Sequence, residues 1–319
     1  MTDCFDPTSL RLLKDPHKIK RKKVLKKIGS HLEENQNKIE DIEPETFEKI
    51  VNCFNDESEV NRELSTNIVT NYLNHSFLAV ERDIPVTYFN KLLPILMNRL
   101  GNEDVFETCE EIRVLQLTLL DFLMANVEKS TNEKERILTM WLSELIAILK
   151  KTCVDDYSEI RKLAHQNIKT LIKNISNTFH LMAEPLLNPV LKSLSHLHSK
   201  VRVSAIQTLG QIVMYGGKEC LPDKIVSHLA QRVFDDHLAV REEVYKFAFM
   251  MMTEYKDRYS FWGHLMPLLL AGLHDENPEV SICLKNSLKH PRFPPPLSSE
   301  DELRQKFINI TFISLRPSH

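Results

Sequence analysis

The sequence is poor in glycine and contains no long apolar run. Only 7 of its 319 residues are glycine, whereas glycine-turned β-sandwiches and nucleotide-binding folds need this residue at many turns. The composition therefore argues against both fold classes. The best apolar stretch, 266–273, falls well short of the roughly 18 residues that a membrane-spanning helix needs. The opening residues, MTDCFDPTSL, also lack the basic-then-apolar pattern of a secretory signal.

Several chemical signatures are missing as well. The sequence has no G-x-x-x-x-G-K-[ST], G-x-G-x-x-G or H-E-x-x-H motif. Its net charge of −3 and pI near 6.5 give no general attraction to nucleic acid or membranes. The cysteines are far apart, with no C-x-x-C pair, at Cys4, Cys53, Cys109, Cys153, Cys220 and Cys283. We expect buried or half-buried thiols in a cytosolic or nuclear protein that uses no cofactor and no small-molecule substrate.

What the sequence does contain is a repeat with a period near forty residues. Six times, a polar residue is followed five positions later by a branched apolar anchor that opens a helix-period run. The first gap between anchors is 52 residues, and the later gaps are 48, 41, 39 and 40. Such a period is typical of stacked helix pairs. The starts and anchors are Asn55 and Val60, Glu107 and Ile112, Asp155 and Ile160, His196 and Val201, Asp235 and Val240, and Asp275 and Val280.

The residues after each anchor fall on one face of a helix. In the fourth unit, Val201, Ala205 and Leu209 follow one another at intervals of four. Across the six units, eleven of the twelve residues at the i+4 and i+8 positions are apolar, with Gln116 the exception. The pattern predicts an all-α fold, an α-solenoid of stacked HEAT-type antiparallel helix pairs.

The repeats divide the chain into three predicted parts. Residues 1–45 are expected to form basic N-terminal capping helices. Residues 46–290 are expected to form a HEAT-repeat array of about six units. Residues 291–319, which open with the proline run of HPRFPPPL, are expected to form a linker and an irregular or truncated tail.

Turn aspartates and arginines recur at fixed places in the repeat. An aspartate in the turn can accept hydrogen bonds from backbone N–H groups at the start of the second helix. An arginine beside the anchor can reach the turn aspartate of a neighbouring repeat, as we predict for Arg202 and Asp235. The predicted ladder consists of Asp155, Asp235, Asp275, Arg113, Arg161, Arg202 and Arg241. The core anchors beside it are Ile112, Ile160, Val201, Val240 and Val280.

Three polar clusters could carry chemistry. The run KIKRKKVLKK, 18–27, is either the solvated face of a capping helix or a docking patch for an acidic partner. His196 and His198 are two residues apart and would diverge on a helix, which argues against a metal site. The Asp-Asp-His sequence at 235–237 coincides with a repeat turn, so turn capping explains it without catalysis.

Beyond the generic repeat, several stretches resemble one family. ETCEEIRVLQLTLL (107–120), TFHLMAEPLLNPVLKSLSH (178–196), HSKVRVSAIQTLGQIV (198–213), SHLAQRVFDD (227–236) and DRYSFWGHLMPLLLAGLHDENPEV (257–280) are similar to the N-terminal portion of dynein axonemal assembly factors of the HEAT-repeat type. The resemblance extends to surface and turn residues. It implies a cytoplasmic, non-enzymatic factor that assembles outer and inner dynein arms for cilia and flagella. It further implies axonemal dynein chains, chaperones and other assembly factors as partners.

The resemblance leaves two questions open. Members of that family are longer, so we expect this chain to be a fragment, a short isoform or a faulty gene model. The alternative function is a generic HEAT adaptor, such as a transport receptor or phosphatase scaffold. No catalytic residue follows from the family, and the partner-binding surface is unknown. Exposed positions of the second helices, such as Gln207, Glu242 and Lys246, are candidates.

Overall fold

The computed structural model describes residues 7–34, 42–79, 81–102, 106–128, 130–220 and 223–288. The chain divides into two compact units, unit 1 from Met1 to Met182 and unit 2 from Ala183 to His319. The tail predicted over 291–319 lies outside the described residues.

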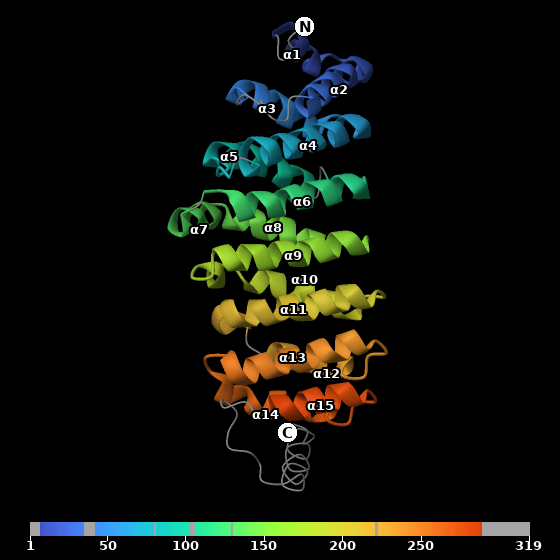
Figure 1. Ribbon diagram of the computed structural model, residues 1–319, viewed down its shortest axis with the longest axis vertical. Coiled ribbons are helices and arrows are strands. Elements are labelled where there is room, and N and C mark those ends of the chain that lie inside the picture. The colour runs from blue at the N-terminus through green and yellow to red at the C-terminus, as the bar shows by residue number, and fades with distance from the viewer. Residues whose placement is uncertain are drawn as a thin grey trace. The chain divides into compact units, whose positions relative to one another are not determined.

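Unit 1 is built from helices joined by short turns (Figure 1). Its described part has no β-sheet, although an isolated bridge joins Ile84 to Val127. The elements are α1 (Pro7–Arg11), η1 (Leu12–Lys14), α2 (Lys18–Glu34), α3 (Pro44–Asn52), η2 (Cys53–Asn55), α4 (Glu59–Leu73), η3 (Asn74–Leu78), α5 (Val86–Leu96), η4 (Met97–Gly101), α6 (Glu110–Asn126), α7 (Thr131–Met140), α8 (Leu142–Thr152), α9 (Ser158–Asn174) and η5 (Phe179–Leu181).

Unit 2 repeats the same plan. Its described elements are α10 (Glu184–Lys192), η6 (Ser193–Ser195), α11 (Ser199–Tyr215), η7 (Gly217–Cys220), α12 (Asp223–Arg232), α13 (Leu238–Glu254), η8 (Arg258–Phe261), α14 (Trp262–Gly272) and α15 (Pro278–Ser287).

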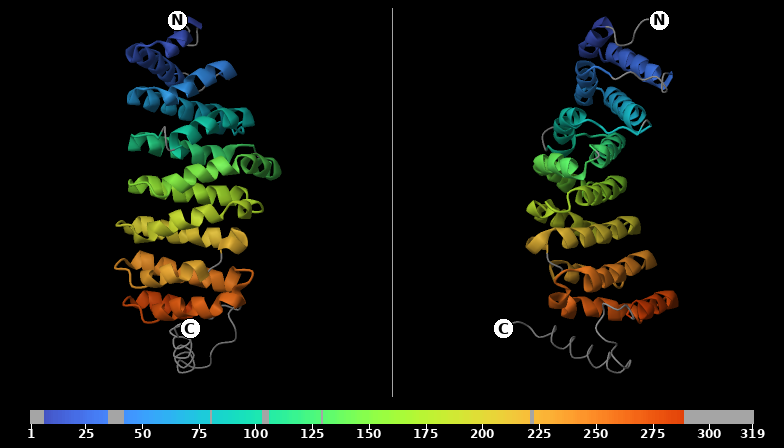
Figure 2. Two further views of the ribbon diagram at one scale, coloured as in Figure 1. Left: turned by 180° about the vertical axis from the view of Figure 1, so that it is seen from behind. Right: turned by 60° about the vertical axis from the view of Figure 1, so that its left-hand side comes forward.

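Within each unit, a first helix packs on the second helix of its pair, and successive second helices pack on one another. The second helices are α2, α4, α6 and α9 in unit 1 and α11, α13 and α15 in unit 2. Figure 2 shows the pairs of each unit following one another in chain order. The predicted all-α fold of stacked helix pairs is confirmed.

Burial of the repeated apolar face holds the pairs together. On α11, Val201, Ala205 and Leu209 have no exposed surface. The other anchors, Ile112, Ile160, Val240 and Val280, are at most 5% exposed. Removing such apolar surface from water contributes about 25 cal/mol per Å², so this face supplies the main stabilisation between neighbouring second helices.

The first repeat begins one residue later than the sequence pattern predicts. Val60, the expected anchor, is 39% exposed, whereas Asn61 is fully buried. Asn61 Nδ2 donates a hydrogen bond to the backbone oxygen of Lys18 at 3.2 Å. Ser65, one turn further along α4, is also fully buried and donates to the backbone oxygen of Arg62. Hydrogen-bonded polar residues therefore occupy core positions here, which hides the register from an apolar pattern.

The cysteines of the described part contribute buried thiols. Cys53, Cys153 and Cys220 are buried and Cys109 is half-buried. Burial raises the pKa of Cys53 to about 12 and also raises the pKa of Cys153. Both thiols are therefore protonated at neutral pH, which makes them poor nucleophiles.

Candidate interaction surfaces

A side-chain acceptor closes each turn between a first and a second helix. In the last described turn, Asp275 Oδ1 accepts a hydrogen bond from the backbone N–H of Asn277 at 2.9 Å. The start of a helix leaves N–H groups without helical partners, so an acceptor here stabilises the turn. His196 takes this place before α11, where its Nδ1 accepts from the N–H of His198 at 3.0 Å. The carboxylates in the equivalent position are Asp15, Asp56, Glu107, Asp155, Asp235 and Asp275.

An arginine six residues after the acceptor ties the second helix back to its own turn. Arg202 Nη1 donates to the backbone oxygens of His196 and Leu197 at 2.8 and 2.9 Å. Arg113 makes the same bonds to Glu107 and Thr108 at 3.0 and 2.9 Å. The guanidinium thereby satisfies carbonyl groups that the turn would otherwise leave unpaired. Arg21, Arg62 and Arg241 repeat this geometry.

The same guanidinium groups also pair with the carboxylate of the following turn. In unit 1, the pairs are Arg21 with Asp56 at 2.6 Å, Arg62 with Glu107 at 2.7 Å and Arg113 with Asp155 at 3.0 Å. In unit 2, they are Arg202 with Asp235 at 2.6 Å and Arg241 with Asp275 at 2.8 Å. Each distance joins a guanidinium nitrogen to a carboxylate oxygen. The result is a ladder of ion pairs within each unit.

These pairs lie largely out of water. The side chain of Asp235 is 2% exposed and that of Arg202 is 9% exposed. Burial raises the pKa of Asp235, but hydrogen bonds from Arg202 and from the His237 N–H lower it more, so the net shift is downward. The hydrogen bond from Arg241 lowers the pKa of Asp275 to about 2 against the opposing effect of burial. Both carboxylates are therefore charged at neutral pH.

Arg161 is the predicted ladder member that the structure does not place on a carboxylate. Within the described residues, its guanidinium donates to the backbone oxygens of Asp155 and Val154. The turn that follows in the sequence carries His196 where other repeats carry a carboxylate. Arg161 therefore keeps the spacing of arginine after acceptor, but it pairs with no carboxylate among the described residues.

The first part of the ladder is not predicted by the apolar repeat pattern. This part contains Arg21, Asp56 and Arg62, which lie outside the predicted ladder, and Glu107, which the pattern marks only as a repeat start. Glu107 is fully buried and binds both Arg62 and Arg99, the latter at 2.5 Å. The sequence feature that identifies these residues is an acidic residue followed six positions later by arginine, which occurs at 15–21, 56–62, 107–113, 155–161 and 235–241.

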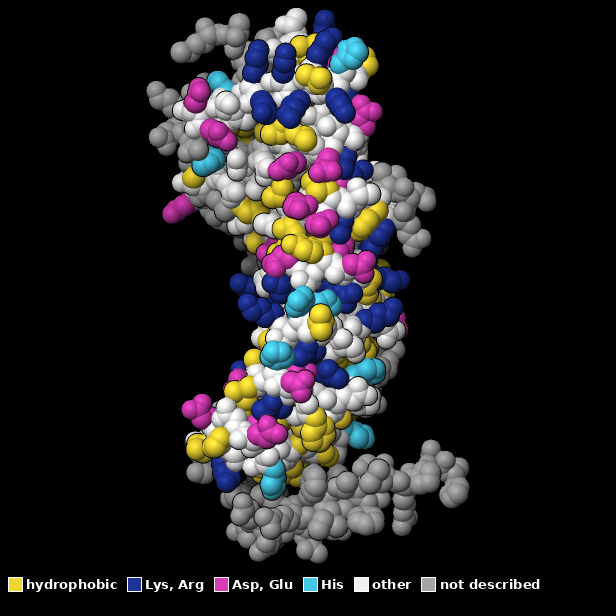
Figure 3. All heavy atoms as spheres, turned by 90° about the vertical axis from the view of Figure 1, so that its right-hand side faces the viewer, with side chains coloured by type: hydrophobic (Ala, Val, Ile, Leu, Met, Phe, Trp, Pro, Cys, Tyr) yellow, Lys and Arg dark blue, Asp and Glu magenta, His cyan; other side chains and the backbone are white. Residues whose placement is uncertain are grey.

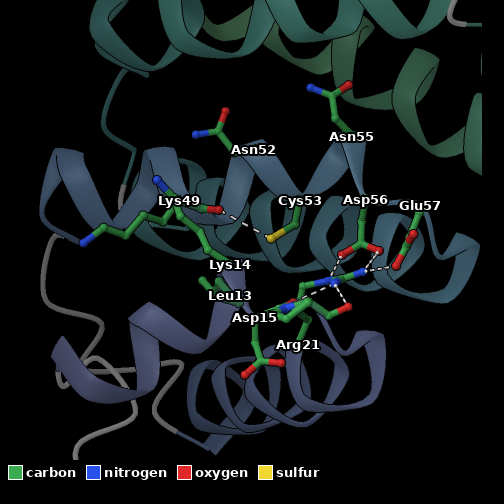
Figure 4. Close-up of a pocket in the computed structure, with 11 residues that line it drawn as sticks. Leu13, Lys14, Asp15, Arg21, Lys49, Asn52, Cys53, Asn55, Asp56 and Glu57 are labelled. Atoms are coloured by element: carbon green, nitrogen blue, oxygen red, sulfur yellow. Dashed lines mark hydrogen bonds and ion pairs between the residues drawn. The ribbon is translucent and has the colours of Figure 1, made fainter.

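A hollow of about 520 Å³ lies beside the first ladder pair (Figure 4). Arg21 donates there to Asp56 and Glu57, and Cys53 Sγ donates to the backbone oxygen of Lys49. Hydrogen bonding to Arg21 keeps the pKa of Asp56 below its usual value despite burial, which raises it. The hollow thus combines a paired carboxylate with a protonated thiol, and this chemistry suits structural packing.

The turns of the repeats also expose large apolar side chains. In unit 2, Leu197 and Phe234 belong to successive turns and are 85% and 84% exposed. Figure 3 shows apolar and histidine side chains along this edge of unit 2. We call Leu197, Phe234 and the flanking histidines of these two turns the turn edge of unit 2; the histidines are His196, His198 and His237. Leu197 and Phe234 are the two most exposed large apolar side chains of the described residues, which makes this edge a candidate contact with a protein partner.

The surface predicted on the second helices is more polar. Gln207 on α11 and Lys246 on α13 are exposed, and Glu242 is half-buried. No group of three His, Cys, Asp or Glu side chains that could hold a metal ion occurs among the residues described. In that same part of the chain, no helix is both long and apolar enough to cross a membrane.

The sequence matches a known protein family over most of its length. The family model described as "Dynein axonemal assembly factor 5-like, TPR repeats" covers residues 12–290. TPR units are about 34 residues long, whereas HEAT and armadillo units are about 40–47. The spacings of 39 to 48 residues between the later anchors agree better with the HEAT length.

Individual relatives carry the same name. The chain is 35% identical to dynein axonemal assembly factor 5 of Xenopus laevis over 236 residues, which is 74% of this chain and 26% of that protein. It is 30% identical to the Homo sapiens protein, covering 73% and 26% respectively. It is 27% identical to the Drosophila melanogaster protein over 252 residues, covering 77% and 28%. The chain therefore spans about a quarter of the length of these relatives.

Solved structures with the same fold are helical-repeat proteins. Yeast importin-β (Kap95p) matches with a TM-score of 0.56 and 12% identity over 88% of this chain and 34% of that chain. A set of computationally designed armadillo repeat proteins for modular peptide recognition matches with a TM-score of 0.52 and 17% identity over 78% and 100%. At such low identity, these matches show the fold alone.

Proposed function

The chain belongs to the dynein axonemal assembly factor 5-like family, and from this premise we propose that it is a non-enzymatic scaffold for assembling axonemal dynein arms in the cytoplasm. The observation that carries the proposal is the family match over residues 12–290. Its partners would be axonemal dynein chains, chaperones and other assembly factors. Such a scaffold would support the motility of cilia and flagella.

The described architecture suits this role physically. Stacked helix pairs offer many exposed side chains at regular intervals, and within each unit a pair is held to its neighbour by packing and by a ladder pair. A client protein would therefore meet side chains whose spacing within a unit is fixed. The likeness to importin-β concerns the fold alone, so nothing favours the transport adaptor over the dynein scaffold.

We place partner contact at the turn edge of unit 2. Leu197 and Phe234 project into solvent with more than four-fifths of their surface exposed. Burying two such side chains against a partner would contribute about 1.5–3 kcal/mol each. A matched polar surface for comparison is provided by Gln207 and Lys246 on the second helices.

Affinity capture from ciliating cells tests both the function and the surface. The tagged full chain should enrich axonemal dynein heavy chains over a tag-only control, as measured by quantitative mass spectrometry. The variant with Leu197→Ser and Phe234→Ser should lose at least fivefold of this enrichment, and the variant with Gln207→Ser and Lys246→Ser should keep it. Loss of dynein enrichment in the second variant alone would indicate that partners contact the second helices instead of the turn edge. Enrichment of transport cargo or phosphatase subunits without any dynein chain would contradict the scaffold role.

A further inference from the structure

Helix α2 carries a face of lysines that take no part in the ion-pair ladder. Lys18, Lys23, Lys26 and Lys27 are exposed and Lys22 is half-buried. None of these five ammonium groups forms an ion pair with another residue of the described part. Figure 3 shows Lys and Arg side chains gathered at the N-terminal end of unit 1.

The charges on this face do not stabilise the helix that carries them. Lysines at 18, 22 and 26, and again at 23 and 27, are four residues apart, and like charges at this spacing repel one another. Cations also lie at the start of α2 and Glu33 and Glu34 at its end, which is opposite to the order that the helix dipole favours. The stability of α2 therefore does not explain the presence of these lysines.

The fold is secured by other residues of α2. Val24, Leu25, Ile28 and Leu32 are at most 4% exposed and form its buried face. Arg21 is buried in the first ladder pair. The lysine face can therefore be changed without touching the contacts that hold α2 in unit 1.

An apolar side chain lies among the lysines. Ile19 is 63% exposed, and on a helix it neighbours Lys22 and Lys23 at the i+3 and i+4 positions. We call Ile19 with Lys18, Lys22, Lys23, Lys26 and Lys27 the α2 basic face. Its chemistry is an exposed branched alkyl group flanked by unpaired ammonium groups.

We propose that the α2 basic face docks a carboxylate-rich segment of a partner protein, in which acidic side chains flank an apolar residue. The acidic groups complement the lysines, and the apolar residue covers Ile19. Nucleic acid fits less well, because α2 has no Phe, Tyr or Trp on which bases could stack and Arg21 is already engaged by Asp56 and Glu57. A membrane fits less well too, because the apolar face of α2 is buried and leaves only Ile19 to insert.

Fluorescence anisotropy with the full chain tests this docking. The probe is a labelled 15-residue peptide of repeated Glu-Glu-Leu, with Gln-Gln-Leu as the uncharged comparison. We expect salt-sensitive binding of the acidic peptide and at least tenfold weaker binding of the Gln peptide. The variant Lys22→Glu, Lys23→Glu, Lys26→Glu, Lys27→Glu should bind the acidic peptide at least tenfold more weakly, and Ile19→Ser at least threefold more weakly.

The control variant makes the same charge change elsewhere. Lys150, Lys173, Lys192 and Lys200 are exposed, and reversing all four should leave peptide affinity within twofold. Circular dichroism should show the helical content of every variant unchanged. Equal binding by the α2 variant and this control, or no binding by the native chain, would overturn the proposal.

Two further probes separate other ligands from an acidic protein segment. A 20-base-pair DNA duplex and vesicles with one-third phosphatidylserine should bind more weakly than the acidic peptide. Tighter binding of either probe, lost in the α2 variant, would overturn the proposal in favour of nucleic acid or membrane. The assay contains no dynein component, so its failure would leave the scaffold proposal standing.

Discussion

At the residue scale, each ladder arginine serves two turns at once. Arg241 donates to the backbone oxygen of Asp235 in its own turn and to the carboxylate of Asp275 in the next. Removing these groups from water carries a desolvation penalty, which the paired charges and the additional hydrogen bonds offset. The ladder therefore acts mainly to fix one repeat against the next. Removing the arginine of a pair should destabilise the fold, because the buried carboxylate loses its main ion-pair partner.

The Arg202–Asp235 pair in unit 2 offers a direct test of this coupling. Arg202→Ala should lower the free energy of unfolding by about 3 kcal/mol, because the buried charge of Asp235 then keeps only the longer ion-pair contact to Arg232, at 3.4 Å. Asp235→Asn keeps an acceptor for the His237 N–H and removes the charge. In a urea-unfolding double-mutant cycle, we expect a coupling energy of about 1–3 kcal/mol. Additive single effects would show that the two side chains are energetically independent.

Arg161 provides the matched control for that cycle. Its guanidinium donates to backbone oxygens of its own turn and pairs with no carboxylate among the described residues. Arg161→Ala should therefore cost about 1 kcal/mol, the value of ordinary hydrogen bonds. A cost equal to that of Arg202→Ala would mean that the turn contacts, and not the ion pair, carry the stabilisation.

Asp275 makes stability depend on acid pH. Its pKa is lowered to about 2 in the folded chain, compared with about 3.9 in an unfolded chain. The carboxylate therefore contributes stability that is fully present above pH 4 and is lost as the pH falls from 4 to 2. The free-energy difference between the native chain and Asp275→Asn, from urea unfolding, should be largest above pH 5 and shrink toward pH 2. A difference that is constant over this range would contradict the assigned pKa.

At the element scale, the second helices define the register of the stack. The apolar pattern located these helices because α6, α9, α11, α13 and α15 carry apolar anchors at the expected positions. It failed by one residue on α4, where Asn61 and Ser65 are buried and hydrogen-bonded. An apolar pattern cannot reveal a core position that a buried polar side chain occupies.

A matched pair of valines on α4 tests this corrected register. Val69 is 1% exposed and Val60 is 39% exposed. Val69→Ala should lower the free energy of unfolding by about 2 kcal/mol, because it removes buried methyl groups and leaves a cavity. Val60→Ala should change it by less than about 0.5 kcal/mol. Equal losses of unfolding free energy in the two variants would instead support the register that begins at Val60.

The ladder shows which part of a site can be foreseen from sequence. Spacing alone led to Arg202 and Asp235 because both recur at fixed offsets from an apolar anchor. Arg99, which also binds Glu107, has no such offset and reaches it only because η4 lies beside that turn. The exposure of Leu197 and Phe234 could not be predicted from the sequence, because an apolar residue in a turn can be either buried in the core or exposed to solvent.

At the scale of the whole molecule, the chain comprises two units of the same construction. The repeat period predicted the fold class, while the family rests on residues between the repeated positions and on the match over 12–290. Periodic core residues recur in any such stack and carry little information about partners. The surfaces that differ between units, the α2 basic face and the turn edge of unit 2, are where this chain can be specific.

The most direct test of the scaffold role is the state of the axoneme when the chain is absent. The gene would be removed in motile ciliated or flagellated cells of the source organism, and axoneme cross-sections would be scored by electron microscopy. We expect loss of outer and inner dynein arms together with loss of motility, both restored by re-expression of the native gene. Complete sets of dynein arms and normal motility in cells lacking the protein would contradict the account.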